Sequence, residues 1–429
     1  MNKMKQTNDY MFAGYDTVEL AKKYGTPLYV LSEESIRSRC KEISTDFLGK
    51  YENSKAVYAS KAFLTMTMCK IIESEGLGLD VVSGGELYTA IKAGFPMDRI
   101  MFHGNNKSYD ELEMAINNDV GRIVVDHIDE LYFIEDIGAR MDKTVKILIR
   151  VAPGVEGHTH KYIITGQKDS KFGIPLNKDT IDEAVSKAMA SKHIQLMGFH
   201  FHIGSNLFEN DSYVAAVKTI MNLYKRLKDD FNFVAKELNT GGGFGIYYTE
   251  KDCVKPLRYF TDAIMKAIYG CCQELDLDMP GVIIEPGRWI VGEAGITLYT
   301  IGAVKEIPGI RTYASVDGGL PDNPRPALYS AEYKAVVANK CGLKPDRLAT
   351  IAGRCCETGD ILIWDLEVPE IKRGDILAVL STGAYNYSMA NNYNRIPRPA
   401  VLLLSKAGER VIVERETYED LLRKEVVPF

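Results

Sequence analysis

The stretch AVYASKAFLTMTMCKIIESEGLGLDVVS, residues 56–83, contains a β-prone run, an apolar helical pattern and a second β-prone run in direct succession. In the first run the small apolar side chains of Val57 and Ala59 alternate with more polar ones, which is the period of a half-buried strand. The helical pattern that follows Lys61 ends at Gly76, a common residue at the end of a helix. The stretch therefore predicts one β/α unit and the strand of the next unit.

The same unit recurs along the first two thirds of the chain. The β-prone runs are separated by amphipathic helical patterns, and there are eight of them: AVYAS, GLDVVS, RIMFHG, RIVVDH, VKILIRV, QLMGFHFHIGS, FVAKELNTGGG and GVIIEPGR. Eight alternating β/α units predict an α/β fold, a closed (β/α)8 TIM-like barrel. In such barrels the functional residues lie at the carboxyl ends of the strands.

Side chains that can do chemistry follow most of these predicted strands. They are Lys61, Asp80, Ser83, His103, His200, His202, the run from Gly241 to Gly243, Glu285 and Arg288. Each has an ordinary structural explanation by itself, but their shared position predicts one site at the mouth of the barrel. The insertion after the fifth strand, residues 152–175, is too polar and too rich in glycine for a core element. We expect it to form an active-site loop.

Beyond about residue 290 the pattern changes to short β-prone runs separated by Gly, Pro and Asn, with little helical periodicity. This pattern predicts a C-terminal all-β domain, of the sandwich or barrel kind. The run TPLYVLS near the N-terminus is also β-prone and precedes the barrel. We therefore expect residues 1–34 to join the β domain, residues 35–290 to form the barrel, and residues 291–429 to form the β domain.

Composition narrows the classes of partner. The chain has 429 residues, 46% hydrophobic and 26% charged, which is typical of a soluble globular protein with large cores. A formal net charge of −6 without a long run of Lys or Arg argues against nucleic acid and anionic membranes as partners. The N-terminus lacks the apolar segment of a secretory signal, and no long uncharged apolar stretch exists. We expect a cytoplasmic protein that acts on small molecules.

The motifs at the strand ends suit particular kinds of ligand. The run LNTGGGFG lets backbone N–H groups approach a phosphate, although three glycines also simply make turns. The motif EPGR places a carboxylate, Glu285, near a guanidinium, Arg288, which suits a ring nitrogen and an anion or else a surface ion pair. Lys61, in a partly desolvated mouth, is a candidate for Schiff-base formation.

The pair His200 and His202 has two interpretations. The residues lie two apart on one strand and so share a face, as two metal ligands would. Alternatively, one imidazole is stacked or packed and the other is hydrogen-bonded. We favour this second interpretation and expect no metal, because no further cluster with ligand spacing completes a metal shell. An imine-forming lysine, a phosphate cradle, a carboxylate for a ring nitrogen and a stacking imidazole together predict a pyridoxal 5'-phosphate site.

The order of these motifs resembles that of a known family. YASKA, HFHIGS, GGGFG, EPGR, GRCCETGD and GAYNYSMANNYN follow one another as in the fold-type III pyridoxal phosphate decarboxylases of basic amino acids. The resemblance covers nearly the whole chain and implies a barrel followed by a β domain. Within that family, HTHKYIITGQKDSKFGI and PRPALY are most similar to the branch that converts meso-2,6-diaminopimelate to L-lysine and CO2, the last step of lysine biosynthesis. Decarboxylation of ornithine, lysine, arginine or carboxynorspermidine is the alternative within the family.

The resemblance also implies roles for particular residues. As catalytic residues it implies Lys61, which carries the cofactor as an internal aldimine, and Cys356, which donates a proton. The cofactor-binding residues that it implies are Lys61, His202, Ser205, Gly243, Glu285, Gly287, Arg288 and Tyr385. The substrate-binding residues that it implies are Arg288, Arg325, Tyr329, Glu357 and Tyr385. It further implies a homodimer in which Cys356 and Glu357 complete the site of the neighbouring subunit.

Hypotheses from other classes make different predictions. A pseudoenzyme would lack the lysine or the cysteine, and both are present. An amino-acid racemase of related architecture would need a second catalytic base, and the C-terminal motifs do not resemble such an enzyme. A metal-dependent barrel hydrolase predicts bound zinc and no chromophore. A binding protein without activity predicts ligand retention without release of CO2.

Overall fold

The computed structural model describes residues 9–154 and 170–429 of the chain, which fall into two compact units. The barrel unit consists of Arg37–Ile246 and Cys253–Ile290, and the β unit consists of Met1–Ile36, Tyr247–Asp252 and Val291–Phe429. The short segment Tyr247–Asp252 lies within the range expected for the barrel, yet it belongs to the β unit. Its contacts with that unit include a hydrogen bond of 2.9 Å from the Ser381 hydroxyl to the carbonyl of Tyr247 and an ion pair of 2.7 Å between Lys251 and Glu332.

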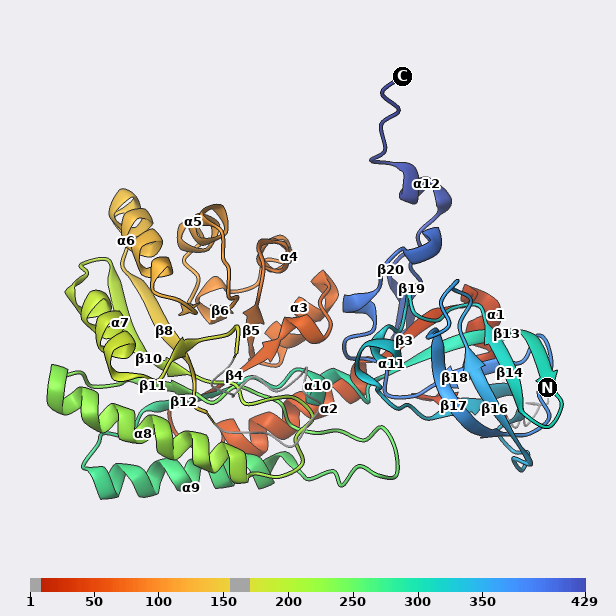
Figure 1. Cartoon of the computed structure of the whole chain (residues 1–429), viewed down its shortest axis with the longest axis horizontal. Helices are drawn as coiled ribbons and strands as arrows, with labels where there is room; N and C mark the ends of the chain where they lie inside the picture. Colours follow the sequence, from red (N-terminus) through yellow and green to blue (C-terminus); the bar gives the residue numbers. More distant parts are fainter. Residues whose placement is uncertain (1–8, 155–169) are drawn as a thin grey trace. The chain divides into compact units, whose positions relative to one another are not determined.

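Eight parallel strands form the closed sheet of the barrel unit (Figure 1). In chain order they are β4 (Ser54–Ala59), β5 (Gly78–Val81), β6 (Ile100–Phe102), β7 (Arg122–Val125), β8 (Val145–Ala152), β10 (Ile194–His200), β11 (Glu237–Asn239) and β12 (Gly281–Ile284). Each pairs with the next, and β12 pairs with β4 to close the ring. A short strand, β9 (Ile174–Pro175), pairs only with β8. The predicted (β/α)8 barrel is confirmed.

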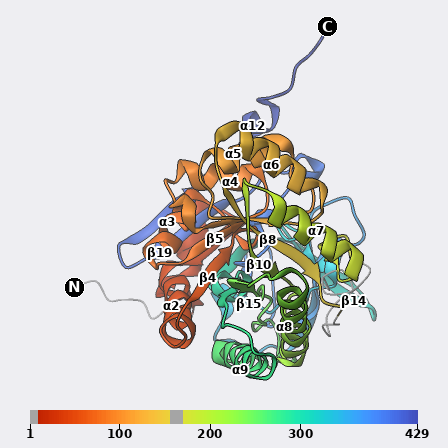
Figure 2. The same cartoon turned by 90° about the vertical axis from the view of Figure 1, so that its left-hand side faces the viewer.

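Helices between the strands surround the barrel, as the end-on view in Figure 2 shows. They are α3 (Met66–Ser74), α4 (Gly84–Lys92), α5 (Tyr109–Asn117), α6 (Asp129–Met141), α7 (Lys178–Ala190), α8 (Asp211–Phe231) and α9 (Leu257–Leu275), and α2 (Glu33–Ile43) precedes the first strand. Their buried residues recur at helical spacing, as with Val217, Ile220 and Tyr224 on α8. Each helix therefore covers the sheet with one apolar face.

Apolar side chains from six of the eight strands fill the interior of the barrel. The buried layer consists of Val57, Met101, Val124, Leu148, Met197 and Ile283. Because this layer closes the centre of the barrel, the polar residues that follow the strands gather at the carboxyl end. The fold thus separates a packed interior from a polar mouth.

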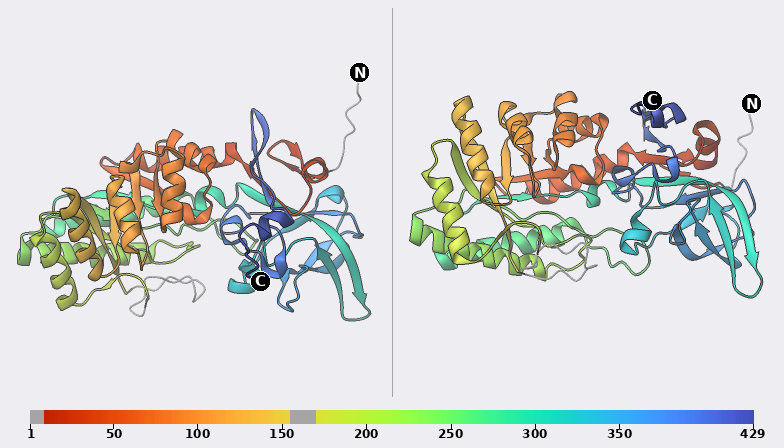
Figure 3. Two further views of the ribbon diagram at one scale, coloured as in Figure 1. Left: turned by 90° about the horizontal axis from the view of Figure 1, so that it is seen from above. Right: turned by 45° about the horizontal axis from the view of Figure 1, so that its top comes forward.

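The β unit contains a second sheet, built mainly from the C-terminal part of the chain. Its strands are β3 (Leu28–Ser32), β13 (Gly295–Ile307), β14 (Arg311–Val316), β15 (Ala335–Val337), β16 (Arg347–Ala352), β17 (Ile361–Val368), β18 (Ile376–Val379), β19 (Ala400–Ser405) and β20 (Gly408–Val413). The long hairpin of β13 and β14, in teal, is visible in both views of Figure 3. The predicted all-β domain is confirmed.

Short elements complete the β unit. They are β1 (Met11–Phe12), β2 (Tyr15–Asp16), α1 (Thr17–Tyr24), α11 (Arg325–Tyr329) and α12 (Tyr418–Leu422), and α10 (Arg288–Val291) follows the last barrel strand. The N-terminal strand β3 lies inside the sheet, antiparallel to β13 and parallel to β19. All five of its residues are buried, which explains why the sequence from Leu28 to Leu31 does not alternate between apolar and charged residues.

None of the helices in the described part of the chain is long and apolar enough to cross a membrane.

Candidate active site

Lys61 follows the first strand of the barrel directly. It lies in a single helical turn, Ser60–Ala62, after β4, and its side chain is exposed although both neighbouring residues are buried. Its ammonium makes no ion pair with any residue that the structure describes. The positive charge of Lys61 nevertheless acts to lower the pKa of Asp80, Glu86 and His202, because it makes protonation of each group less favourable. The chain therefore presents an accessible amine beside a polar cluster at the carboxyl ends of the strands.

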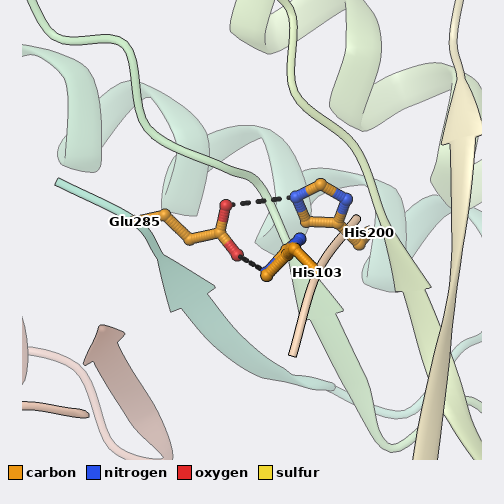
Figure 4. Close-up of side chains that lie close together, drawn as sticks. All are labelled: His103, His200 and Glu285. Atoms are coloured by element: carbon orange, nitrogen blue, oxygen red, sulfur yellow. Dashed lines mark hydrogen bonds and ion pairs between the residues drawn. The ribbon is translucent and has the colours of Figure 1, made fainter. Parts of the chain in front are cut away.

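Glu285 is the centre of that cluster. Its Oε1 lies 2.8 Å from Nε2 of His103, and its Oε2 lies 3.1 Å from Nε2 of His200, as Figure 4 shows. The side-chain amide of Asn239 donates a further hydrogen bond of 2.7 Å to Oε1. These partners lie at the carboxyl ends of three different strands, so only closure of the barrel brings them together. All four side chains are buried.

The surroundings of Glu285 favour its ionised form. Burial alone would raise the pKa of this carboxyl, but the facing imidazoles of His103 and His200 hold it well below its usual range. Burial lowers the pKa of His200 to about 4. His200 is therefore neutral near pH 7 and donates its Nε2–H to the carboxylate, while its buried Nδ1 has no hydrogen-bond partner among the described residues. The result is a fixed negative charge buried at the polar mouth of the barrel.

Two further carboxyl groups, Asp80 and Glu86, interact with the charge of Lys61, and the pKa of each is raised above its usual value. Burial raises the pKa of Asp80, whose Oδ1 lies 3.8 Å from Nε2 of His103. Burial, with the neighbouring charge of Asp80, raises the pKa of Glu86 to about 7. Ser83, at the same strand end, caps helix α4 by accepting the backbone N–H of Glu86. Ser83 thus has a structural role, whereas Asp80 belongs to the cluster.

His202 makes its hydrogen bond to the glycine run and not to Glu285. Its Nδ1 accepts the backbone N–H of Gly242 at 3.3 Å, so its proton is on Nε2. Burial, and then the positive charge of Lys61, lowers its pKa well below the usual range. His202 is therefore a neutral, half-buried imidazole whose orientation is set by the glycine run.

Glycines allow the strand-end turns to approach one another closely. Gly243 has a φ of +105°, and a Cβ there would lie 2.2 Å from the carbonyl oxygen of Gly204, next to Ser205. At Gly287 a Cβ would lie 2.8 Å from that of Ala59, which is two residues before Lys61. Any larger residue would push these turns apart.

Arg288 connects two of the same turns. Its Nη2 donates a hydrogen bond of 2.9 Å to the hydroxyl of Ser205. Arg288 is buried, and Ser205 is half-buried. A guanidinium and a hydroxyl thus lie together beside the glycine run, which is a donor set suited to a phosphate.

The donor set of the mouth fits pyridoxal phosphate. It contains an accessible amine, an ionised carboxylate for a ring nitrogen, a neutral imidazole, and a guanidinium with a hydroxyl near glycine turns. Part of this donor set could also hold a metal ion, because ligand atoms of His103, His200 and Glu285 lie within 4.8 Å of one another. His202 is not in that set, contrary to the His200–His202 pair that the metal alternative required. Moreover, the two Nε2 atoms already contact the carboxylate oxygens.

A second group of predicted site residues lies in the β unit. Arg325 opens α11 and is buried, and its Nη1 donates to the hydroxyls of Tyr333 at 2.6 Å and Tyr248 at 3.3 Å. The ring of Tyr385 also faces this guanidinium, with 5.9 Å between Cζ and the ring centroid. Tyr329, which we expected to act with Arg325, is half-buried at the end of α11 and contributes no hydrogen bond to it.

The two adjacent cysteines differ in their surroundings. Cys356 is exposed, and its backbone N–H donates to the side-chain oxygen of Asn394 at 3.0 Å. Cys355 is half-buried, and burial together with Asp360 raises the pKa of its thiol to about 12. Glu357 is exposed and accepts a hydrogen bond from the hydroxyl of Tyr393. The exposed pair Cys356 and Glu357 is therefore the more available for chemistry.

Asp360 holds the turn that carries this pair. Its carboxylate accepts the backbone N–H of Cys355 at 2.8 Å and that of Leu320 at 2.7 Å. The glycine at 353 is required there, because a Cβ would lie 2.2 Å from the Asp360 carboxylate.

Several site residues did not follow from the sequence. The sequence pattern does not indicate Asn239 or the partners of Arg325, Tyr248 and Tyr333, and it gives His103 no specific role. A signal existed for Asn239, which ends a strand in the run LNTGGG. The expected active-site loop cannot be compared in the same way, because residues 155–169 lie outside the described residues.

Comparison with known proteins agrees with these features. The model of the family described as pyridoxal-dependent decarboxylase, pyridoxal binding domain, matches residues 33–292. Diaminopimelate decarboxylase of Bacillus subtilis is 49% identical over 428 residues, covering 100% of this chain and 97% of its own, and that of Staphylococcus aureus is 42% identical, with 98% of each covered. A crystal structure of diaminopimelate decarboxylase from M. jannaschii in complex with L-lysine superposes with a TM-score of 0.92 at 34% identity. It covers 99% of this chain and 97% of its own.

Proposed function

The chain belongs to the pyridoxal-dependent decarboxylase family, and we propose from this premise that it decarboxylates meso-2,6-diaminopimelate to L-lysine and CO2. The full-length similarity to diaminopimelate decarboxylases supports this substrate. The observation that carries the proposal is the Glu285 carboxylate, which three polar side chains hold in a buried, ionised state at the mouth of the barrel. A carboxylate of this kind is required opposite a ring nitrogen that must remain protonated.

Pyridoxal 5'-phosphate is the cofactor of the family, and the mouth of the barrel contains residues suited to it. When bound, it supplies an electron sink for the electron pair that remains when CO2 departs. We assign Lys61 to its covalent attachment, Glu285 to the ring nitrogen and His202 to the face of the ring. We assign the phosphate to a set of residues from the turns and the β unit: Ser205, Gly243, Gly287, Arg288 and Tyr385.

Glu285 maintains the charge that the chemistry requires. Because its pKa is held well below the usual range, it stays ionised at neutral pH and favours a proton on any basic nitrogen placed against it. His200 and Asn239 fix the orientation of the carboxylate by donating to different oxygens. This fixed charge is preorganised, so it needs no rearrangement during the reaction.

We assign proton donation to Cys356 and recognition of the substrate's distal ammonium to Glu357. Both side chains are exposed in the subunit, which supports a role in a site completed by a second copy of the chain. We therefore propose a cytoplasmic homodimer in which each subunit contributes Cys356 and Glu357 to the site of its partner. The raised pKa of Cys355 supports a passive role for that thiol.

Arg325 is the residue we assign to the distal carboxylate of the substrate, with Arg288, Tyr329 and Tyr385 as further substrate contacts. Arg325 is buried but makes no ion pair with a carboxylate among the described residues. A buried cation without a negative partner is costly, and a carboxylate ligand removes that cost. This feature favours a dicarboxylic substrate over ornithine, lysine or arginine, each of which has a single carboxylate.

The test combines spectroscopy with a substrate comparison. We expect the purified protein to show the visible absorption of lysine-bound pyridoxal phosphate, and borohydride reduction to fix the cofactor on Lys61. We expect faster CO2 release from meso-2,6-diaminopimelate than from L-ornithine, L-lysine or L-arginine. Absence of the absorption, or label on another lysine, would refute the assignment of the cofactor site, and faster turnover of ornithine would refute the substrate.

A further inference from the structure

Arg325 is an unusual buried cation. Its side chain lies in the β unit with only 7% of the residue exposed. Within the described residues no Asp or Glu lies at ion-pair distance from it, whereas the buried Lys107 and Arg150 each lie at ion-pair distance from a carboxylate. Burial of a charge without such a partner must be offset by other contacts.

Tyrosines supply those contacts. The Arg325 Nη1 donates to the Tyr333 hydroxyl at 2.6 Å and to the Tyr248 hydroxyl at 3.3 Å. Its Cζ lies 5.5 Å from the ring centroid of Tyr248, 5.8 Å from that of Tyr333 and 5.9 Å from that of Tyr385. Aromatic rings at this distance attract a guanidinium without neutralising it. The positive charge is therefore retained for a ligand.

Tyr333 accepts the shorter of the two hydrogen bonds from Arg325. It is 4% exposed, and its ring packs edge-on against that of Tyr248 with 5.4 Å between centroids. Its hydroxyl also lies 3.5 Å from the side-chain amide of Asn386. The phenol ring is thus held in place by packing, and its hydroxyl accepts the shorter hydrogen bond from Arg325.

The pattern of hydrogen bonds leaves one edge of the guanidinium available. Both hydrogen bonds to described residues use Nη1 of Arg325. The edge formed by Nε and Nη2 has no acceptor among those residues. This edge has the geometry that binds a carboxylate through two parallel hydrogen bonds. The hydrogen bonds donated by Nη1 therefore set the direction in which that edge faces.

We propose that Tyr333 is a positioning residue that aims Arg325 at the carboxylate of the substrate's non-reacting end and thereby makes binding depend on that carboxylate. The inference rests on the proposed function, because it deepens the role of Arg325 in the same site. meso-2,6-Diaminopimelate and its product L-lysine both have this carboxylate, whereas 1,5-diaminopentane has the same carbon chain and amines without it. The proposal therefore predicts a change confined to ligands that retain the carboxylate.

The experiment uses the cofactor-loaded enzyme and the substitution Tyr333→Phe, which removes the hydroxyl and keeps the ring. We expect the KM for meso-2,6-diaminopimelate and the inhibition constant of L-lysine each to rise about tenfold, the effect of losing one hydrogen bond to a charged group. The inhibition constant of 1,5-diaminopentane and kcat should both change by less than about twofold. Arg325→Lys removes the planar guanidinium itself, so it should raise the KM and the L-lysine inhibition constant by more than Tyr333→Phe does.

Controls separate this role from a general structural one. Tyr15→Phe removes a hydroxyl that donates to the carbonyl of Ser405 in the same unit, and it should leave all three constants unchanged. Tyr248→Phe removes the longer hydrogen bond to Arg325, so it should raise the constants for L-lysine and substrate by a smaller factor. This second variant also tests the proposal if Tyr333→Phe does not fold.

The outcomes distinguish the proposal from the function on which it rests. Equal weakening of L-lysine and 1,5-diaminopentane in both tyrosine variants would overturn the positioning role, as would unchanged constants in both. Failure of the wild-type enzyme to release CO2 from meso-2,6-diaminopimelate would instead overturn the proposed function. Selective weakening of the two carboxylate-bearing ligands supports the proposal.

Discussion

The Nε2 atom of His200 lies 3.1 Å from Oε2 of Glu285, and both side chains are buried at the mouth of the barrel. Because burial lowers the pKa of His200 to about 4, this contact is a hydrogen bond from a neutral imidazole to a carboxylate at neutral pH. The pair therefore carries a net negative charge, which a protonated ring nitrogen would balance. Its titration gives the first prediction.

Stability should fall as the pH is lowered from about 6.5 to 4. Above pH 6.5 His200 is neutral in both the folded and unfolded states. Below it the unfolded chain takes up a proton that the folded protein does not, so His200 alone costs up to about 3 kcal/mol of unfolding free energy by pH 4. Urea unfolding at several pH values should show this loss in the wild type. His200→Gln, which keeps an N–H donor and does not titrate, should lose less over the same range; identical pH profiles would contradict the assignment.

The substitution Glu285→Gln should reduce kcat by a hundredfold or more, as roughly expected when a preorganised charge is removed from an active site. Decarboxylation and the absorption spectrum of the bound cofactor provide the measurement. The matched control is Glu237→Gln. Glu237 is a similarly buried glutamate that pairs with Arg122 and Lys55, and its loss should lower thermal stability and leave kcat unchanged. Comparable activity of the two variants would remove Glu285 from the mechanism.

The adjacent cysteines allow a direct comparison. Cys356→Ala should abolish turnover and retain the cofactor spectrum, because the exposed thiol is the assigned proton donor. Cys355→Ala should remain active, because that thiol is half-buried with a pKa of about 12. Steady-state CO2 release by both variants decides the matter. Near wild-type activity of Cys356→Ala would show that another group delivers the proton.

Mixing two inactive variants tests the shared site. The two variants are Lys61→Ala and Cys356→Ala. In the proposed dimer, each active site combines Lys61 of one subunit with Cys356 of the other. Random reassociation should restore about a quarter of the wild-type activity, because half of the dimers then contain one intact site. The measurement is CO2 release after subunit exchange, with each variant alone as the control. No recovery despite exchange would place both residues in the same subunit's site.

Chelation distinguishes the cofactor site from a metal site. The atoms of His103, His200 and Glu285 lie close enough to hold an ion, but the imidazole nitrogens already contact the carboxylate. Dialysis against a strong chelator should leave decarboxylation unchanged, whereas removal of pyridoxal phosphate should abolish it until the cofactor is restored. Loss of activity on chelation, with recovery on addition of zinc, would instead favour the metal-dependent alternative.

The barrel was predictable because its signals are local. Each strand is a short apolar run, each helix has its own apolar face, and alternation of the two kinds over eight units leaves few architectures. The position of the site followed from the same rule, since Lys61, Asp80, His200 and Glu285 all lie at or just beyond the carboxyl ends of strands. The sequence pattern did not separate Tyr247–Asp252 from the barrel, because six residues without periodicity give no indication of the unit in which they pack.

The contacts within the site were less predictable, because they depend on distances between strands. His103 and His200 reach opposite oxygens of Glu285 only because the strands that precede them close into one ring. Arg325 illustrates the same limit, because its guanidinium donates to Tyr333 and to the distant Tyr248, and the sequence pattern indicates neither partner. Pairings of this kind are tertiary and leave no local pattern.

The position of β3 between β13 and β19 has a consequence for synthesis on the ribosome. The strand leaves the ribosome first, but β19 begins only at Ala400, so roughly 20 to 70 seconds of translation separate the emergence of the two partners. All the strands of the barrel are made in that interval. The barrel can therefore fold while the nascent chain still holds, near its beginning, an unpaired strand that is wholly buried in the folded protein. This makes Leu28–Ser32 the segment we expect a chaperone to protect.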